Sequence, residues 1–552
     1  MPKQDIKKII EKCILINAVE HQGKAVAGIV LGRVMAENPE LRTNVKQVKK
    51  IIESEVKKIN SLSIEEQKSK LKKFGAYEKQ IRTERKGLAD LPDVKKDFVV
   101  RFAPNPDGAL TLGNARPAVL SDEYAKRYKG KFILRFDDTD PKIKKPEKQF
   151  YEWVMDDLKW LGIKTDKKIY QSKRLKIYYR YAEKLIKLGY GYVCDCKTET
   201  WRKLRDNTEP CPCRSLTKNE HLSRWEKMLN AEYKEGQAIL RIKTDLKHPN
   251  LAVRDWPAMR IVDKPQHPMA KANVWPLYNF ASAIDDYLLG ITHILRGQEH
   301  STNTTKQKYI YDYFNWKYPV VSLLGRFSLT GSVLSKSKTR SGIAKGEFAG
   351  WDDPRLGTLM TLRRRGFHPN AIRNIIVDIG LKSNDITISS ENLAAFNKKV
   401  IDPVANRYFF VPNPVKIEVR NLPIKNIDIP LHPSSPIGDK RHLELKKYFY
   451  VDKNDFKSFK GKEVRLKDLC NIELDKISKF TGFEIKKGIQ KIQWVPADYV
   501  NVRVIKPDAV VNGYGETSMK ALKAGNIIQM ERFGFGRVES VGKEIVICYG
   551  HR

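Results

Sequence analysis

Four of the seven cysteines stand close together in two short motifs, CDC and CPC, as Cys194, Cys196, Cys211 and Cys213. Two close pairs of thiols separated by a short segment form the ligand pattern of a tetrahedral Zn²⁺ site. A disulfide is disfavoured under the reducing conditions that we expect for this chain. The pattern predicts a structural zinc site, and reduced thiols without a metal are the alternative.

The segment RFAPNPDGALTLGNARPAVL, residues 101–120, has the residue types of a nucleotide site. Small residues such as Ala109 and Gly113 let the backbone approach a nucleotide, and a helix that starts there offers free N–H groups to phosphate. Neither GxGxxG nor GxxxxGK[ST] is present, so ordinary dinucleotide and P-loop sites are disfavoured. A strand, turn and helix without a ligand is the alternative.

Two other segments carry charged groups that can bind ligands. The acidic cluster LRFDDTDP, residues 134–141, suits the rim of a ligand site, although metal binding and an ordinary capped turn are also open. The segment GSVLSKSKTR, residues 331–340, is a lysine-rich loop, which by itself indicates only a solvated surface.

Different structural elements must position these groups. Apolar FVVRFAP, a helical segment and KFILRF form a strand–helix–strand unit, which predicts a parallel sheet with its ligand site at the carboxyl ends of the strands. Residues 1–95 have helical periodicity, and Ser63 with Glu66 predicts a capping box. Beyond residue 405, alternating apolar residues predict antiparallel barrels or sandwiches.

The charge of the chain indicates a polyanionic partner. Lys plus Arg number 103 and Asp plus Glu 65, which gives a net charge of +38. Nucleic acid is favoured over a membrane surface, and a merely lysine-rich solvated surface is the alternative. No apolar run approaches the roughly 20 residues of a membrane span. The N-terminal MPKQDIKKIIEKC fits neither a signal nor a transit peptide, so we expect a cytoplasmic protein with no membrane partner.

Together these motifs resemble the class I aminoacyl-tRNA synthetases, in the form of the archaeal glutamyl enzymes. In the H-x-G-H signature of the class, Thr111 and Asn114 take the positions of the two histidines around Gly113. Both side chains can donate hydrogen bonds to phosphate, but neither carries a positive charge. The K-M-S-K-S signature corresponds to VLSKS at residues 333–337, which implies that Lys336 contacts the ATP phosphates.

Three further segments resemble glutamyl and glutaminyl enzymes: residues 134–141, 274–300 and 351–367. By resemblance, the glutamate site consists of Arg101, Asp137, Tyr278 and Arg296. Asp137 would hold the substrate ammonium group and Arg296 the side-chain carboxylate, with Arg101 as a second positive contact. Glutaminyl relatives have an uncharged residue in place of Arg296, because a neutral amide would leave a buried guanidinium unpaired.

The resemblance also assigns the other sites. The ATP-binding residues would be Pro104, Asn105, Gly108, Leu112, Gly113, Asn114, Ser335, Lys336 and Ser337. The catalytic residues would be Thr111, Gly113, Asn114 and Lys336. The residues that contact tRNA phosphates would be Arg363, Arg364 and Arg365, for which a solvated basic helix face is the alternative.

The implied fold is a Rossmann-type α/β core with an inserted domain, helical regions and C-terminal all-β barrels. Its domains would be a helical accessory domain (1–95), the first catalytic half (96–194), an acceptor-stem domain with the candidate zinc site (195–270), the second catalytic half with the lysine loop (271–345), a helical stem-contact region (346–404) and anticodon-binding β-barrels (405–552).

The implied function is the ATP-dependent activation of L-glutamate and its transfer to the 3′ end of tRNA(Glu), with tRNA(Gln) as a second candidate acceptor. ATP, Mg²⁺ and Zn²⁺ are the implied cofactors, and the family default is a monomer. A glutaminyl-tRNA synthetase is one alternative. A tRNA-binding relative that has lost catalysis is the other, since Thr111 and Asn114 depart from the signature.

Overall fold

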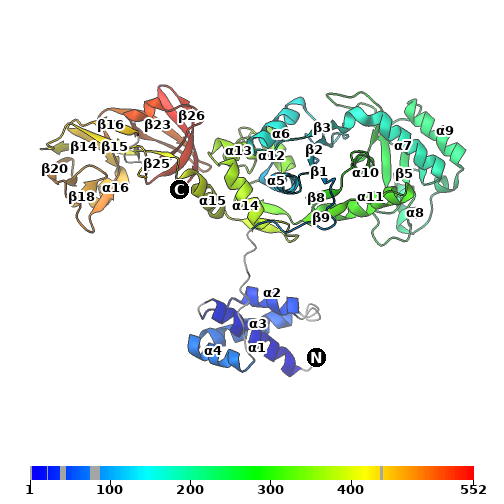
Figure 1. Cartoon of the computed structure of the whole chain (residues 1–552), viewed down its shortest axis with the longest axis horizontal. Coiled ribbons are helices and arrows are strands. Elements are labelled where there is room, and N and C mark those ends of the chain that lie inside the picture. Colours follow the sequence, from blue (N-terminus) through cyan, green and yellow to red (C-terminus); the bar gives the residue numbers. More distant parts are fainter. Residues whose placement is uncertain (1–2, 22, 38–44, 75–86, 435–438) are drawn as a thin grey trace. The chain divides into compact units, whose positions relative to one another are not determined.

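The computed structural model describes residues 3–21, 23–37, 45–74, 87–434 and 439–552. Contacts divide the chain into two compact units, Met1–Arg85 and Lys86–Arg552, drawn in Figure 1. The parts of the N-terminal helical prediction that fall on residues 1–2, 22, 38–44 and 75–86 lie outside the described residues. In the described parts, no helix is both long and apolar enough to cross a membrane.

The first unit consists of helices packed around an aliphatic core. Its described helices are α1 (Lys3–Glu20), α2 (Ala27–Glu37), α3 (Val45–Asn60) and α4 (Ile64–Lys72). The predicted capping box is confirmed, because the Glu66 N–H donates to Ser63 Oγ at 3.3 Å and the Ser63 N–H donates to Glu66 Oε2 at 2.8 Å. Ile14 and Ile52 are fully buried where the helices meet.

The second unit contains a five-stranded parallel sheet in the order β3-β2-β1-β8-β9 (Figure 1). The strands are β1 (Val99–Phe102), β2 (Lys131–Phe136), β3 (Lys167–Tyr170), β8 (His293–Gly297) and β9 (Val320–Leu324). The helices around it are α5 (Leu112–Arg127), α6 (Lys148–Trp160), α10 (Tyr278–Leu288) and α11 (Ser301–Tyr313). This arrangement confirms the predicted Rossmann-type core.

The strand order reverses between β1 and β8: β2 and β3 follow β1 toward one edge of the sheet, and β9 follows β8 toward the other. In open α/β sheets, ligands bind outside the carboxyl ends of the strands at such a switch point. The inner strands of the sheet are short and largely buried, with three of the four residues of β1 and five of the six residues of β2 buried, as expected where helices cover both faces. The nucleotide-like segment 101–120 therefore begins at the position where a ligand is expected.

An antiparallel four-stranded sheet is inserted between β3 and β8. Its strands are β4 (Gly191–Cys194), β5 (Ile239–Ile242), β6 (Pro257–Ile261) and β7 (Val274–Pro276). The accompanying helices are α7 (Leu175–Leu188), α8 (Thr198–Asp206) and α9 (Lys218–Leu229). Trp256 and Trp275, which are almost fully buried, fill the core beneath this sheet.

A helical region follows β9. Its elements are β10 (Phe327–Leu329), α12 (Lys336–Ala344), α13 (Leu359–Arg364), α14 (Pro369–Ile379), β11 (Ile386–Ile388) and α15 (Ser390–Ile401). The segment 331–340, predicted as a loop, is a loop only as far as Ser335. Ser335 caps α12 by accepting a hydrogen bond from the Lys338 N–H at 3.4 Å, so Lys336 is the first residue of a helix.

Two seven-stranded sheets form the C-terminal part and confirm the predicted all-β region. The first has the order β12-β25-β26-β27-β23-β24-β13 and the second β21-β18-β19-β20-β14-β17-β22. Both sheets are mixed, because four pairs in them are parallel: β12–β25, β23–β27, β14–β20 and β18–β21. The expectation of antiparallel strands holds for most pairs of these sheets and was wrong for these four.

The bounds of the first sheet are β12 (Asn406–Tyr408), β13 (Phe410–Pro412), β23 (Tyr499–Ile505), β24 (Val510–Glu516), β25 (Ile527–Met530), β26 (Gly534–Val541) and β27 (Glu544–His551). Those of the second are β14 (Pro414–Arg420), β17 (Tyr448–Asp452), β18 (Glu463–Leu466), β19 (Asn471–Glu473), β20 (Ile477–Gly482), β21 (Gln490–Ile492) and β22 (Trp494–Pro496). A hairpin of β15 (Asn426–Pro430) and β16 (Lys440–Glu444) and the helix α16 (Lys453–Phe459) accompany them. Val500, Val502 and Val504 of β23 are buried on one face, as their alternation predicts.

Candidate functional site

A cavity of about 1080 Å³ opens at the carboxyl ends of β1, β2 and β8, beside the N-terminus of α5. It brings together most of the residues that the sequence predicts for ATP and glutamate: Arg101, Pro104, Asn105, Thr111, Gly113, Asn114, Asp137, Tyr278, Arg296, Ser335, Lys336 and Ser337. Gly108 and Leu112 do not line it. Gly108 lies under the Trp351 ring, which a Cβ would approach to 2.4 Å, and Leu112 is fully buried in the core.

The N-terminus of α5 forms one wall of the cavity and has a reciprocal cap. The Thr111 N–H donates to Asn114 Oδ1 at 3.1 Å, and the Asn114 N–H donates to Thr111 Oγ1 at 3.4 Å. Because Oδ1 is used in this cap, Asn114 has its Nδ2 left to donate to a ligand. The helix dipole and the remaining N–H groups of the first turn make this wall attractive to phosphate.

A buried network of two arginines and two aspartates borders the cavity, which its members Arg101 and Asp137 line. Arg101 Nε donates to Asp286 Oδ1 at 3.1 Å, and Arg135 Nη1 donates to the same oxygen at 2.6 Å. Arg135 also donates to both oxygens of Asp137, at 2.6 and 3.2 Å. Burial opposes the ionisation of Asp286, but the two guanidiniums hold its pKa below the ordinary value. The positive charge of Arg101 is therefore already balanced inside the chain.

Arg296, at the end of β8, differs from these arginines in its partners. Its side chain donates to Gln307 Oε1 at 3.0 Å, Thr304 Oγ1 at 2.5 Å and Tyr318 OH at 3.2 Å, all of which are uncharged. Across the described residues it has no carboxylate partner, and its buried Nε has no hydrogen-bond acceptor. Arg296 is only 5% exposed. A buried, uncompensated guanidinium facing a cavity is the chemistry of a carboxylate site.

The residues that orient Arg296 were missed in the sequence. Thr304 and Gln307 stand three positions apart on α11, so the same face of the helix presents both side chains. They belong to the segment STNTTKQ, whose polar spacing was the available signal. His300, which precedes α11, also lines the cavity. Its pKa is lowered to about 4, mainly by burial and secondly by the positive charge of Arg296. His300 is therefore neutral at physiological pH and leaves the charge to Arg296.

Lys336 reaches the cavity from α12 and contacts the turn after β1. Its Nζ donates to Asn105 O and to Asp107 Oδ1, each at 3.0 Å. Burial lowers its pKa, although Asp107 opposes that shift. The lysine predicted to meet phosphate thus lines the same cavity as the N-terminus of α5 and is paired with Asp107, a residue that the sequence motifs did not single out.

Arg363, Arg364 and Arg365, at the C-terminal end of α13, have different surroundings. Arg364 binds Glu539 through Nε and Nη2, and Arg365 donates to the backbone oxygens of Tyr549 at 3.1 Å and Gly550 at 2.7 Å. These contacts tie α13 to the C-terminal sheet, so the geometry favours a structural role for both, and their contact with tRNA stays a prediction. Arg363 is about one-third exposed, and its ion-pair partner among the described residues is Asp157, at 4.0 Å.

Asp157 on α6 carries a testable consequence for stability. It is fully buried, neither carboxylate oxygen has a hydrogen-bond partner among the described residues, and burial raises its pKa to about 7. An unfolded aspartate titrates near pH 4, so folding stability falls as pH rises from about 4 to about 7. We expect Asp157→Asn to raise the free energy of unfolding above pH 7 by roughly 2 to 4 kcal/mol and to lose this gain as pH falls toward 4.

Thermal unfolding at about pH 5 and pH 8 checks this prediction. Asp156→Asn is the matched control, because Asp156 is exposed on the same helix. An equal change in both variants, or a gain that is the same at both pH values, would contradict the proposed titration.

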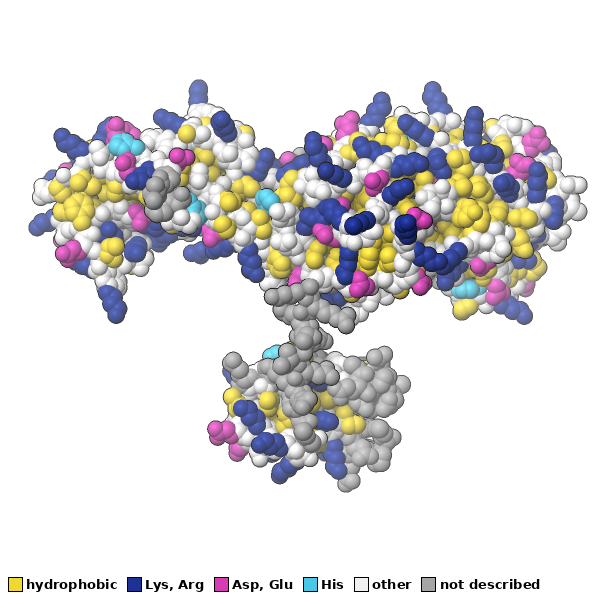
Figure 2. Space-filling model, viewed as in Figure 1, with side chains coloured by type: hydrophobic (Ala, Val, Ile, Leu, Met, Phe, Trp, Pro, Cys, Tyr) yellow, Lys and Arg dark blue, Asp and Glu magenta, His cyan; other side chains and the backbone are white. Residues whose placement is uncertain are grey.

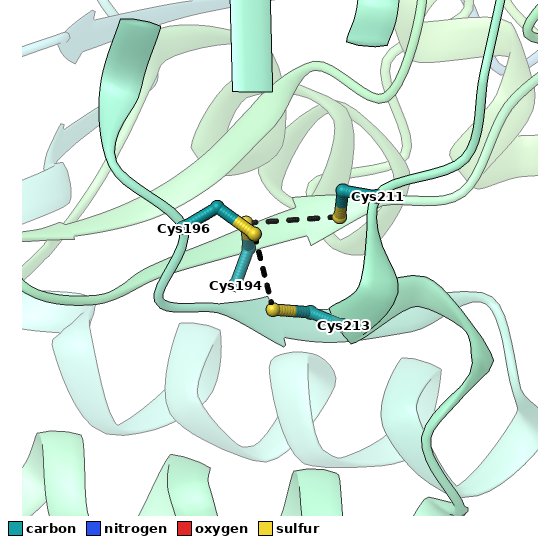
Figure 3. A group of neighbouring side chains, drawn as sticks. All are labelled: Cys194, Cys196, Cys211 and Cys213. Atoms are coloured by element: carbon teal, nitrogen blue, oxygen red, sulfur yellow. Dashed lines mark hydrogen bonds between the residues drawn. The ribbon is translucent and has the colours of Figure 1, made fainter. Parts of the chain in front are cut away.

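The four cysteines converge in the inserted domain, as Figure 3 shows. Their sulfur atoms all lie within 4.8 Å of one another, with Cys194 and Cys211 Sγ 3.9 Å apart and Cys196 and Cys213 Sγ 3.5 Å apart. Tetrahedral Zn–S bonds of about 2.3 Å place sulfurs about 3.8 Å apart, so this donor set fits zinc. Arg224, beside Asp195 at 3.0 Å and Cys213 Sγ at 3.6 Å, supplies a positive charge next to the thiols.

Family models match nearly all of the chain after its first unit. The model described as tRNA synthetases class I (E and Q), catalytic domain, matches residues 97–403. Two models described as anti-codon binding domains of the same family match residues 405–490 and 491–539. The first of these matches covers more than half of the chain, including every segment that lines the cavity.

Curated relatives match the whole chain. A glutamate–tRNA ligase from Pyrococcus abyssi is 53% identical over 99% of this chain and 100% of its own length. One from Pyrococcus horikoshii is 52% identical with the same coverage, and one from Archaeoglobus fulgidus is 44% identical over 99% of this chain and 100% of its own length.

Proposed function

The chain belongs to the class I tRNA synthetases for glutamate and glutamine, and from this premise we propose that it works as a glutamate–tRNA ligase. It activates L-glutamate with ATP and transfers the glutamyl group to the 3′ end of tRNA(Glu). The two alternatives, a glutaminyl-tRNA synthetase and a tRNA-binding relative without catalysis, are not favoured, because the curated relatives that match over the full length are glutamate–tRNA ligases.

The choice of glutamate as the substrate rests on the burial and the uncharged partners of Arg296. Its guanidinium is buried, lines the cavity and has only neutral partners among the described residues. The side-chain carboxylate of glutamate would complete this site, whereas the neutral amide of glutamine would leave the charge uncompensated. Arg101 and Arg135 do not offer the same attraction, since they share Asp286.

In the proposed reaction, glutamate and ATP bind at opposite ends of the cavity. Asp137 accepts the substrate ammonium group, and Tyr278 and Arg101 form the surrounding wall. Asn105, Gly113, Asn114 and the first turn of α5 hold the phosphates, and Mg²⁺, which the family uses with ATP, offsets their charge. The α-carboxylate oxygen of glutamate attacks the α-phosphorus, and the bond from this phosphorus to pyrophosphate breaks.

Lys336 would stabilise the negative charge that accumulates on the departing pyrophosphate. A terminal hydroxyl of the tRNA then attacks the carbonyl carbon of glutamyl-adenylate and AMP leaves. No protein nucleophile is required, so catalysis rests on positioning and charge. Thr111 takes part through the cap that it forms with Asn114, which fixes the first turn of the phosphate-binding helix.

The tRNA would lie along a basic surface of the second unit. Figure 2 shows many Lys and Arg side chains there, over the region that Figure 1 labels α5, α6 and α12. We assign residues 195–270 to the acceptor stem, 346–404 to the stem and the C-terminal sheets to the anticodon. Arg363 is the candidate phosphate contact among Arg363, Arg364 and Arg365, because its side chain is about one-third exposed and its ion pair with Asp157 is long, at 4.0 Å.

Aminoacylation of total tRNA with labelled glutamate and labelled glutamine tests the proposal. We expect charging by glutamate and, because an uncompensated guanidinium rejects the amide, a preference over glutamine of about 10³-fold or more in kcat/KM. Charging by glutamine alone, or tRNA binding without any charging, would overturn it.

We also propose that the four cysteines hold one structural Zn²⁺ ion. The donor set and the sulfur spacing support this, and the ion would join β4 to the turn at Pro212–Ser215. Metal analysis of the purified protein is expected to give about one equivalent of zinc, and Cys211→Ser is expected to lose it. Cys470→Ala, which changes a buried cysteine of the C-terminal sheets, is the control. Less than half an equivalent in the unchanged protein would contradict the proposal.

Three broader assignments belong to the same proposal. The chain is expected to act in the cytoplasm, where tRNA is charged, and as a monomer. A second candidate acceptor is tRNA(Gln), and charging of purified tRNA(Gln) with glutamate decides whether the enzyme accepts it.

A further inference from the structure

Asp107 lies where the turn after β1 contacts the N-terminal part of α12, the two segments that bring Asn105 and Lys336 to the cavity. It lies in the turn after β1, lines the cavity and holds Lys336 Nζ at 3.0 Å from its Oδ1. Both side chains are largely buried, with 20% of Lys336 and 18% of Asp107 exposed. The second contact of Lys336 is the backbone oxygen of Asn105 at 3.0 Å. Two of the three Lys336 donors and its whole charge are therefore engaged within the chain.

The surrounding contacts hold the backbone on both sides of this pair. Arg340 of α12 donates to Asp107 O, and its Nη2 lies 3.3 Å from Glu147 Oε1. The segment before α12 is fixed separately, because the Gly357 N–H donates to Val333 O at 3.1 Å. Lys336 can therefore change its partner by rotating its own long side chain, while the ends of both segments stay in place.

The charges dictate that this pair cannot persist unchanged when ATP binds. A triphosphate in the cavity brings several negative charges close to the Asp107 carboxylate, and like charges at such distances repel. A single ammonium group cannot offer its full charge both to Asp107 and to phosphate. Because the carboxylate lines the same cavity as Asn105 and Asn114, it competes with the nucleotide for one cation.

We propose that Asp107 is an internal competitor of ATP, a carboxylate that holds Lys336 until the phosphates take it over. The inference rests on the proposed function, since it takes the ligand of Lys336 to be a triphosphate. Asp107 lowers the affinity for ATP and keeps Lys336 from acting before the nucleotide is in place. It is a positioning residue, which acts through Lys336 and not on the substrate.

Equilibrium binding of a non-hydrolysable ATP analogue with Mg²⁺ tests this without requiring the reaction. The proteins are the full-length chain and its Asp107→Asn, Lys336→Met and doubly substituted variants, with thermal unfolding to establish that each is folded. We expect Asp107→Asn to tighten binding about fivefold when Lys336 is present, and by less than about twofold in the Lys336→Met background. Glu147→Gln is the matched control, because it frees Arg340 but not Lys336, and it is expected to leave the affinity unchanged.

Three other binding results would contradict the proposed competition or the proposed function. Equal tightening in both backgrounds would mean that Asp107 only repels phosphate through space, and the proposed competition would be wrong. Weaker binding by Asp107→Asn would mean that Asp107 supports the bound nucleotide, directly or through Mg²⁺, and would also overturn it. Failure of the unchanged chain to bind the analogue at all would count against the proposed function itself.

Discussion

Replacing Arg296 by methionine is expected to reduce kcat/KM for glutamate in aminoacylation by about 10³-fold. The substitution keeps an unbranched side chain of comparable length and removes a buried positive charge that has no carboxylate partner within the described chain. The glutamate side chain would then be buried without a counter-ion, near Asp137 and Glu299, which also line the cavity. Steady-state kinetics with glutamate as the varied substrate gives the measurement.

A second variant separates the charge of Arg296 from its shape. Gln307→Glu keeps the volume of the side chain but places a carboxylate where Gln307 Oε1 now accepts from Arg296 Nη1 at 3.0 Å. We expect KM for glutamate to rise about 10-fold or more while KM for ATP stays the same, because Arg296 is then neutralised from within. If Arg296→Met keeps full glutamate charging, or if Gln307→Glu leaves KM for glutamate unchanged, the carboxylate site lies elsewhere.

Replacing Lys336 by methionine is expected to slow the formation of glutamyl-adenylate by roughly 10²- to 10³-fold. The loss arises in the transition state, where charge passes to the pyrophosphate and a preorganised ammonium group stabilises it most. KM for glutamate is expected to change little, since Lys336 contacts Asn105 and Asp107, and neither Arg296 nor the Arg135–Asp137 pair is among its partners in the described chain. Single-turnover formation of the adenylate in the presence of tRNA gives this rate directly.

The matched control for Lys336 is Lys345→Met. Lys345 is exposed at the C-terminal end of α12 and, unlike Lys338, does not line the cavity. The control is expected to retain the rate of the unchanged protein within about twofold. A comparable loss in both variants would show that the basic surface as a whole, and not the group paired with Asp107, assists the departure of pyrophosphate.

Much of the fold follows from local sequence. The apolar runs of β1 and β2 with α5 between them predict a parallel sheet, and Ser63 with Glu66 predicts the start of α4, because both depend on neighbouring residues. The start of α12 was harder to predict. Its lysine-rich segment resembles a solvated loop, and the helix depends on the Ser335 cap and on the backbone contact between Val333 and Gly357. The parallel pairs of the C-terminal sheets likewise join strands remote in the chain, such as β23 and β27.

In the candidate site, too, some residues could be predicted from local motifs and others could not. Its ligand-type residues stand in contiguous motifs, so Asp137, Tyr278, Arg296 and Lys336 could be chosen before the structure placed them on one cavity. Their supporting residues could not. Asp286, which binds Arg101, is 185 positions away from it in the chain, and no local pattern connects the two.

The sequence by itself determined the family, the order of the segments around the cavity and the four-cysteine set, because each is written in short motifs whose residue types follow from local chemistry. Only the tertiary structure decided which charges are already paired. It couples Arg101 to Asp286, Arg364 to Glu539 and Lys336 to Asp107, and it surrounds Arg296 with neutral groups. The physical reason is that the availability of a charge depends on its nearest neighbours in space, which long-range packing brings together.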